Sequence, residues 1–353
     1  MARGALSRRA ITGGAAAATL ALLVPALAAG APASVQVGDF NRSPEIAFNA
    51  FYPGHLTVTK GSTVTFAVAG FHTVTFPKRG TKPPSFILPT SALNPATNDP
   101  GGAPYWWGGV TPLISFNGAA VAPSGGTAVT GAKTVSSGLP QGNAPKFTVS
   151  FPKLGTFQVR CVIHPNMRGS VTVVPKTAEA ADTAKRAEAR AAREKARQRA
   201  RIDAAIAKAK KTKGNTVIIS PGDSTAQAFA FYPGAKTVPV GSSVTFKMSA
   251  RNEVHTVSFG PTAFLENVGK AAFQGNGLEV GSEGFYPSDP PAAGPPSVTA
   301  ASHGNGFVSS GVLSDPGTGI PAPHAFTVTF PQAGTFKYIC LIHTEMHGTI
   351  TVG

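Results

Sequence analysis

The chain contains one sequence unit twice, and this duplication limits its fold more than any other feature. Three segments of the first copy return in the second at an offset of 180 or 179 residues: 51–54 as 231–234, 61–66 as 241–246, and 147–152 as 326–331. We therefore predict one fold used twice, as a first domain over residues 29–175 and a second over 214–353, each with its own core.

Apolar and polar residues alternate within each copy. Val64, Phe66 and Val68 fall on one face of an extended segment, and Gly- and Pro-rich turns divide such segments. The chain has 40 Gly and 31 Pro without a collagen period, and 42% of its residues are hydrophobic. These features favour the all-β class, with short antiparallel strands in two sandwiches. The long segments 77–145 and 260–324 are expected to hold extra strands or a packed loop.

A charged stretch separates the copies. Residues 176–213 contain 13 Lys and Arg against 5 Asp and Glu and lack Gly and Pro, which predicts a helical linker. Much of the chain's net charge of +15 lies here, so the composition does not indicate a specific nucleic-acid-binding surface. Its only larger apolar residues are Ile202 and Ile206, which favours a solvated spacer over an arm that contacts an anionic cell-wall or membrane surface.

Residues 1–28 are typical of an export signal. Arg3, Arg8 and Arg9 precede an apolar run, and Ala26-Leu27-Ala28 offers a small-residue cleavage site. We expect the mature protein to be exported and to be secreted, cell-wall-associated or periplasmic. The general secretory and twin-arginine routes both remain open.

The scarcest residues of the chain fall in register between the copies. Its only two cysteines, Cys161 and Cys340, each stand three residues before a histidine, and that histidine stands three residues before a methionine. Each copy also has one histidine on an upstream strand. A thiolate, two imidazoles and a thioether suit copper, whereas structural zinc sites usually have more thiolates and seldom a methionine.

This Cys-x-x-His-x-x-Met pattern resembles the ligand loop of the cupredoxins, the plastocyanin, amicyanin and pseudoazurin family of blue-copper proteins. The resemblance implies two Greek-key sandwiches with one copper ion each, and two sets of ligands: His72, Cys161, His164 and Met167, then His255, Cys340, His343 and Met346. It also implies that the edges of the two downstream histidines lie near the surface as electron exits. Many members have Asn after the upstream histidine, where this chain has Thr73 and Thr256, whose hydroxyls are expected to replace the Asn hydrogen bond.

The function that follows is electron transfer by two blue (type 1) copper centres with redox partner proteins, without enzymatic activity. Extracytoplasmic copper sequestration or delivery is the alternative, because it requires the same ligands. A multicopper oxidase-type enzyme is less favoured. Such enzymes need His-x-His pairs and a histidine beside the coupling cysteine, whereas Cys161 is flanked by Arg160 and Val162, and no His-x-His occurs.

Overall fold

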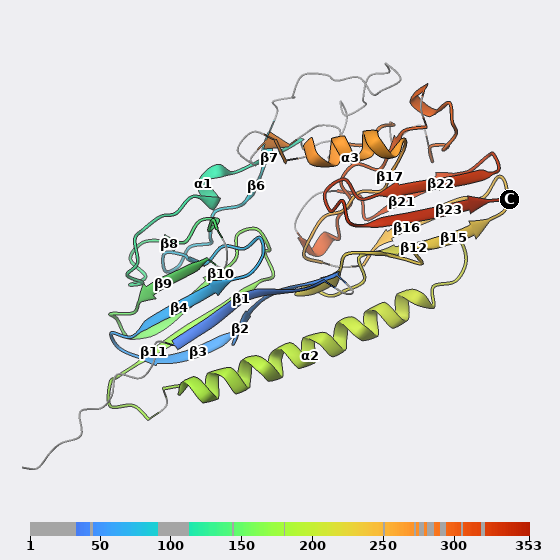
Figure 1. Cartoon of the computed structure of the whole chain (residues 1–353). Coiled ribbons are helices and arrows are strands. Elements are labelled where there is room, and N and C mark those ends of the chain that lie inside the picture. The colour runs from blue at the N-terminus through green and yellow to red at the C-terminus, as the bar shows by residue number, and fades with distance from the viewer. Residues whose placement is uncertain are drawn as a thin grey trace, which may run out of the picture. The chain divides into compact units, whose positions relative to one another are not determined.

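Two β-sandwiches with the same strand order make up most of the structure, a computed structural model (Figure 1). The structure describes residues 33–353 apart from these segments: 43–44, 91–112, 143–144, 180, 250, 272, 275–278, 281–285, 290–293, 305 and 319–321. The predicted export signal, 1–28, lies outside the described residues. The domain boundaries 29–175, 176–213 and 214–353 stay predictions.

The first sandwich packs two sheets face to face. The strands of the first copy in its first sheet have the order β2 (Glu45–Tyr52), β1 (Ala33–Arg42), β4 (Thr63–Val68) and β9 (Lys146–Ser150). A strand of the second copy, β13 (Ala226–Ala228), extends this sheet beside β2. Its second sheet has the order β3 (His55–Thr59), β11 (Arg168–Val174), β10 (Gly155–Arg160), β5 (Thr75–Phe76) and β8 (Val135–Ser136). The alternation predicted from the sequence is observed, since Val64, Phe66 and Val68 all lie in the core between the sheets.

The second sandwich repeats this order. Its first sheet has the order β14 (Phe231–Tyr232), β12 (Thr216–Ile219), β16 (Ser243–Met248) and β21 (Ala325–Thr329). Its second sheet has the order β15 (Ala235–Val238), β23 (His347–Val352), β22 (Gly334–Ile339), β17 (Ser258–Phe259) and β20 (Val308–Ser309). Even the register is kept, because Val64 pairs with Val149 as Val244 pairs with Val328. The predicted all-β fold of two sandwiches is confirmed.

The expectation of antiparallel pairing throughout is wrong in one respect, because the sheets are mixed. β1 runs parallel to β4, and β3 runs parallel to β11. β2 and β3 follow one another with only Pro53 and Gly54 between them, and they belong to different sheets. The chain therefore returns from the second sheet to place β4 beside β1 in the same direction. The second copy has the same two parallel pairs.

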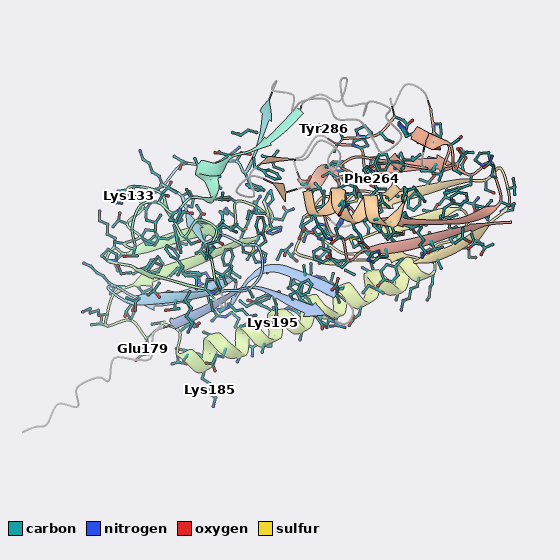
Figure 2. The ribbon with its side chains drawn as sticks, turned by 45° about the horizontal axis from the view of Figure 1, so that its top comes forward. Lys133, Glu179, Lys185, Lys195, Phe264 and Tyr286 are labelled. Carbon is teal, nitrogen blue, oxygen red and sulfur yellow. The ribbon has the colours of Figure 1, made fainter. Side chains whose placement is uncertain are left out.

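The long insertions contain extra elements, as expected. In the first copy β6 (Ile87–Thr90) pairs with β7 (Leu113–Phe116), and the short helix α1 (Gly118–Val121) follows. In the second copy the insertion holds α3 (Thr262–Ala271), the pair β18 (Phe273–Gln274) and β19 (Glu279–Val280), and the 3-10 turns η2 (Ser302–Gly304) and η3 (Pro316–Thr318). Phe264 and Tyr286 belong to a small apolar cluster of this second insertion (Figure 2).

The linker is helical, but it is not a solvated spacer. Helix α2 (Ala184–Lys210) begins at Thr183, whose side chain accepts a hydrogen bond from the Arg186 backbone N–H. Ile202 and Ile206 are both buried in a cluster with residues from both copies: Ile46, Phe48, Tyr52, Ala226 and Ala228. The spacer expectation fails because β13 (Ala226–Ala228) of the second copy pairs with β2 of the first, which brings an apolar surface from both copies under the helix.

Polar contacts fix the rest of the helix. Asp182 accepts hydrogen bonds from the Thr57 backbone N–H at 2.8 Å and from the Arg190 guanidinium at 2.6 Å. Glu194 accepts a hydrogen bond from the Gly54 N–H at 2.9 Å, and Lys195 pairs with Asp39 at 3.0 Å. Lys185, by contrast, is exposed near the start of α2 (Figure 2). None of the described helices is both long and apolar enough to cross a membrane.

Replacing the buried Ile202 tests this packing. Ile202→Ala should lower the free energy of unfolding by about 2–4 kcal/mol, because it leaves a cavity in a cluster shared by helix and sheets. The exposed Arg197→Ala on the same helix should change it by less than about 0.5 kcal/mol. Urea unfolding of the full chain measures both. Equal effects of the two substitutions would show that the helix is only a spacer.

Candidate metal centres

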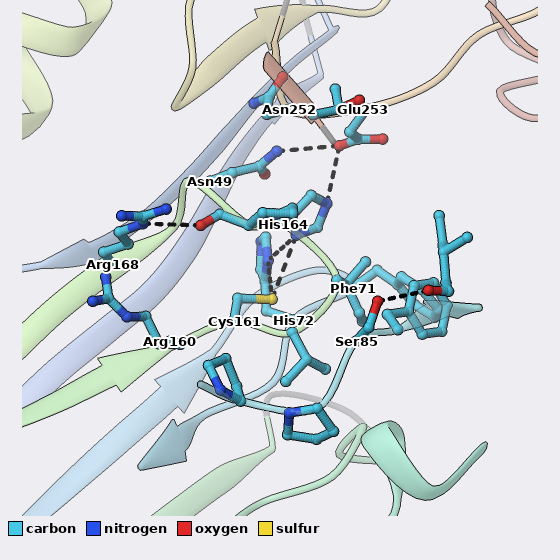
Figure 3. A pocket seen from close by; sticks show the side chains of 18 of the residues that line it. Asn49, Phe71, His72, Ser85, Arg160, Cys161, His164, Arg168, Asn252 and Glu253 are labelled. Atoms are coloured by element: carbon cyan, nitrogen blue, oxygen red, sulfur yellow. Dashed lines mark hydrogen bonds and ion pairs between the residues drawn. The ribbon is translucent and has the colours of Figure 1, made fainter. Parts of the chain in front are cut away.

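The first sandwich brings together three of the four ligands predicted for it. His72 lies on the segment between β4 and β5, whereas Cys161 and His164 lie on the loop between β10 and β11. The Nδ1 atoms of His72 and His164 are 3.0 Å apart, and Cys161 Sγ lies 4.0 and 3.6 Å from them (Figure 3). All three side chains are buried. The two imidazoles thus direct the same ring atom at one thiol.

Backbone hydrogen bonds close the ligand loop and bring the fourth candidate, Met167, into the core. The Cys161 N–H donates to the Met167 carbonyl at 3.1 Å, and the Met167 N–H donates to the His164 carbonyl at 2.8 Å. Met167 is 1% exposed and belongs to the same core as Cys161. Gly169 follows on β11, and a Cβ there would lie only 3.0 Å from the Gly54 carbonyl oxygen. A glycine therefore lets the strand after the loop approach the Pro53–Gly54 turn.

The second sandwich repeats the arrangement with the other predicted set. The Nδ1 atoms of His255 and His343 are 3.1 Å apart, and Cys340 Sγ lies 3.8 Å from each. The Cys340 N–H donates to the Met346 carbonyl at 3.0 Å, and the Met346 N–H donates to the His343 carbonyl at 2.9 Å. Cys340 and Met346 are fully buried. The structure therefore brings six of the eight predicted residues together in two matching His, Cys, His clusters. Met167 and Met346 lie in the same cores as Cys161 and Cys340, and the role of all eight residues as metal ligands stays a prediction.

Electrostatics prepare each cysteine to bind a cation. Burial alone raises the pKa of the Cys161 thiol, but hydrogen bonds with His164 and His72 outweigh it and hold the pKa well below its usual value. Cys340 is held as a thiolate in the same way by His255 and His343. Burial in turn lowers the pKa of His72. A buried thiolate beside two imidazoles is a suitable donor set for a soft metal ion.

The donor chemistry fits copper in both clusters. In each of them the sulfur and the two ring nitrogens lie within 4.8 Å of one another. One thiolate and two imidazoles, with a buried methionine in the same core, are donor types that would hold copper. The ligand loop is closed on itself by hydrogen bonds, so the donors are held before a metal arrives.

The threonines after the upstream histidines support both ligand loops, as the resemblance suggested. Thr73 Oγ1 accepts a hydrogen bond from the Val162 backbone N–H at 2.9 Å, and Thr256 Oγ1 accepts one from the Leu341 N–H at 2.7 Å. Their backbone N–H groups donate to the cysteine sulfurs, Thr73 at 3.4 Å and Thr256 at 3.3 Å. Each threonine thus ties the upstream segment to the loop and stabilises the thiolate.

One residue beside the clusters was missed by the sequence analysis. Glu253 lies against the outer edges of both downstream histidines, with Oε1 3.3 Å from His164 Nε2 and Oε2 2.9 Å from His343 Nε2. The side chains of His164 and His343 are only 6% and 16% exposed, because Glu253 covers their outer edges, so the expectation that these edges lie near the surface as electron exits is corrected. A signal existed in the repeat: five residues lie between Phe66 and His72, but eight lie between Phe246 and His255. Glu253 is one of these eight.

Glu253 also affects the protonation of both histidines in the metal-free chain. Burial opposes the charged form of His164, but hydrogen bonds with Cys161 and Glu253 raise its pKa to about 10. His343 has a pKa raised to about 10 by Cys340 and Glu253 against the same burial. The carboxyl pKa of Glu253 is held well below its usual value by the two histidines, although burial raises it. A negative charge is thus kept between the two clusters.

Solved structures similar to this chain are cupredoxins. Plastocyanin from Dryopteris crassirhizoma is 20% identical over 39% of this chain and 99% of its own, with a TM-score of 0.21. A purple cupredoxin from Nitrosopumilus maritimus is 19% identical over 40% and 100%, with a TM-score of 0.22. Auracyanin A from Chloroflexus aurantiacus is 24% identical over 35% and 89%, with a TM-score of 0.21. No family model matches the sequence, and a search of curated proteins found no significant match.

The resemblance predicted two sandwiches with one group of candidate ligands in each. The chain itself contains two such sandwiches and two matching His, Cys, His groups. The two sandwiches and the two candidate ligand groups therefore agree with the prediction made from the sequence.

Removing the Thr73 hydroxyl tests whether its hydrogen bond to the ligand loop stabilises the first sandwich. Thr73→Val should cost about 1–3 kcal/mol of stability in the metal-free protein, because the Val162 N–H is left buried without its acceptor. Thr73→Ser keeps the hydroxyl and should retain most of that stability. Urea unfolding of the two variants makes the comparison, and Thr256→Val repeats it in the second copy. If Thr73→Val were as stable as Thr73→Ser, the hydroxyl would have no structural role.

Proposed function

We propose that this protein is an exported electron carrier with two type 1 copper centres, one in each sandwich. The observation that carries the proposal is the pair of matching buried clusters, each with a thiolate and two Nδ1 atoms directed at one point. Copper bound there supplies a one-electron couple between Cu(I) and Cu(II). Export rests on residues 1–28, and a location outside the cytoplasm follows from it.

The protein's own residues would keep the geometry of each site nearly constant during electron transfer. His72 and Cys161 come from separate segments of one rigid sandwich, and Thr73 ties those segments together. The ligands are nearly excluded from water, with Cys161 at 2% exposure and Cys340 at 0%. A site that neither opens nor changes its water content needs little rearrangement when an electron arrives or leaves.

Copper sequestration or delivery remains the alternative, because it uses the same donors. Delivery requires a ligand to leave the metal, whereas every cysteine and methionine candidate here is buried and held in a closed loop. These features favour retention of the metal and thus electron transfer. A role without catalysis stays a prediction, and so does the absence of an oxidase-type reaction.

The partners in this proposal are redox proteins. The exposed basic residues of α2, such as Lys185, would add contact with an anionic cell-wall or membrane surface. No specific nucleic acid is proposed, because the basic residues lie on a helix whose buried face packs against both sandwiches.

Removing one thiolate should remove one centre. The loaded chain should bind two copper ions and show an intense visible thiolate-to-copper absorption that ascorbate bleaches. Cys161→Ala should halve both the copper content and the absorption, and Cys340→Ala should do the same, because each cluster has its own sulfur. Metal analysis and absorption spectra measure this. Loss of both sites from one substitution, or zinc in the native protein, would contradict the proposal.

The two centres should differ in reduction potential, with the first the higher. Arg160 and Arg168 flank the first ligand loop where the second has Ile339 and His347, and Glu345 lies inside the second loop. Positive surroundings favour Cu(I), the less charged ion. At an effective dielectric of about 20, one charge about 8 Å away contributes about 2 kcal/mol before screening.

Redox titration of two full-length variants measures this difference. Cys340→Ala leaves the first centre and Cys161→Ala leaves the second, so each potential is read alone. A higher potential at the second centre would overturn the proposed order. The full chain is used because β13 and α2 join the two copies.

A further inference from the structure

One carboxylate group contacts a candidate ligand of each centre. Glu253 Oε1 lies 3.3 Å from His164 Nε2, and Oε2 lies 2.9 Å from His343 Nε2. In both histidines Nδ1 faces the cysteine of its own cluster, so Nε2–H is the donor at the outer edge of the ring. We call His164–Glu253–His343 the carboxylate bridge.

Two asparagines of the first copy hold Glu253 and the segment that carries it. Asn49, on β2 of the first sandwich, donates a hydrogen bond from Nδ2 to Glu253 Oε1 at 3.2 Å (Figure 3). Asn166, inside the first ligand loop, donates from Nδ2 to the Arg251 carbonyl at 2.8 Å. The carboxylate side chain is 15% exposed. Asn49 therefore binds the carboxylate itself, and Asn166 binds the backbone two residues before it.

An aromatic contact orients the second histidine of the bridge. The Phe229 ring stacks on the His343 ring, with centroids 4.5 Å apart and planes 19° apart. The Phe229 N–H donates to the Glu45 carbonyl at 2.8 Å, so this ring is anchored on the first copy. Two residues of the second copy, Glu253 and Phe229, thus depend on the first copy for their placement.

We propose that the carboxylate bridge is the path by which an electron passes between the two centres inside one chain. This inference rests on the proposed function, since it requires both clusters to hold copper. From ring to ring the path contains only two hydrogen bonds and the three atoms of one carboxylate. Contiguous hydrogen bonds of this kind couple sites that have no direct contact.

The proposed step moves one electron within the chain and transfers no proton. One electron leaves the reduced centre and reaches the oxidised one, so one metal is oxidised and the other reduced. The Nε2 protons stay on His164 and His343, and Glu253 stays a carboxylate. No further oxidant or reductant takes part. The protein would thus act as a two-centre relay, with the internal step separate from exchange with redox partners.

The bridge also makes one charge act on both centres. The carboxylate lies at hydrogen-bond distance from an imidazole of each cluster, so its removal should raise both reduction potentials. Glu345 provides a matched control, because it is exposed and lies two residues after His343 in the second loop only. Its removal should raise the second potential and leave the first nearly unchanged.

Two substitutions separate the bridging role of Glu253 from its charge. Glu253→Gln removes the charge and leaves one acceptor oxygen, so only one histidine can donate to it. Glu253→Asp keeps the charge but is one CH₂ shorter and cannot reach both rings. In the copper-loaded full chain, a pulse of less than one electron per molecule reduces one centre. Absorption and freeze-quench EPR then follow the movement of the electron between the two centres. If the rate of this movement does not depend on protein concentration, the transfer takes place within one molecule.

Both substitutions should slow the internal step by roughly tenfold or more, the scale typical of losing an outer partner of a metal-bound histidine. Glu345→Gln keeps the bridge and should change this rate by much less than tenfold, through the altered second potential alone. Redox titration of the Cys161→Ala and Cys340→Ala backgrounds should show that Glu253→Gln raises both potentials, whereas Glu253→Asp leaves both close to their original values.

The outcomes distinguish this inference from the proposed function. Fewer than two copper ions in the unsubstituted chain would count against the proposed function itself. Two copper ions together with an unchanged internal rate in both Glu253 variants would overturn the bridge alone. A potential shift at only one centre in Glu253→Gln would also overturn it.

Discussion

A buried cysteine thiolate in each sandwich is the constraint on which the surrounding structure depends. A charge in an apolar core is costly unless nearby groups stabilise it, and both sulfurs are 2% exposed or less. Around Cys161 that stabilisation comes from two histidines and the Thr73 backbone N–H. The threonine hydroxyl and the Cys–Met backbone hydrogen bond then hold the ligand loop against the upstream segment. The sandwich supplies the rigid frame that keeps these groups together.

The two copies have closely similar cores but differ where they contact each other. Strand order and register repeat, and so do the distances within each cluster. The segment before His255, however, is longer than its counterpart and carries Glu253, for which the first copy has no equivalent. Glu253, which has no counterpart in the first copy, therefore contacts a histidine of each centre. β13 and helix α2 add further contacts between the copies. The two sandwiches are therefore packed together and not joined by the linker alone.

Much of the fold and the candidate sites could be predicted from the sequence because the signals are local. Alternation marks the strands, and fixed spacing around Cys161 and Cys340 marks the ligand loops. The helical composition of 176–213 predicted α2. Its burial could not be predicted, because it depends on the pairing of Ala226–Ala228 with β2, far away in the sequence. Glu253 was missed for the same reason: its role depends on His164 and His343 meeting in space.

The most direct measurement is anomalous diffraction at the copper edge from crystals of the copper-loaded full chain. The account predicts two copper peaks, one within reach of Cys161 Sγ and the Nδ1 atoms of His72 and His164, and one at the matching atoms of the second sandwich. Glu253 should lie between the outer edges of His164 and His343. A single peak shared by the two copies, or a peak at Glu253 with both cysteine clusters empty, would contradict it.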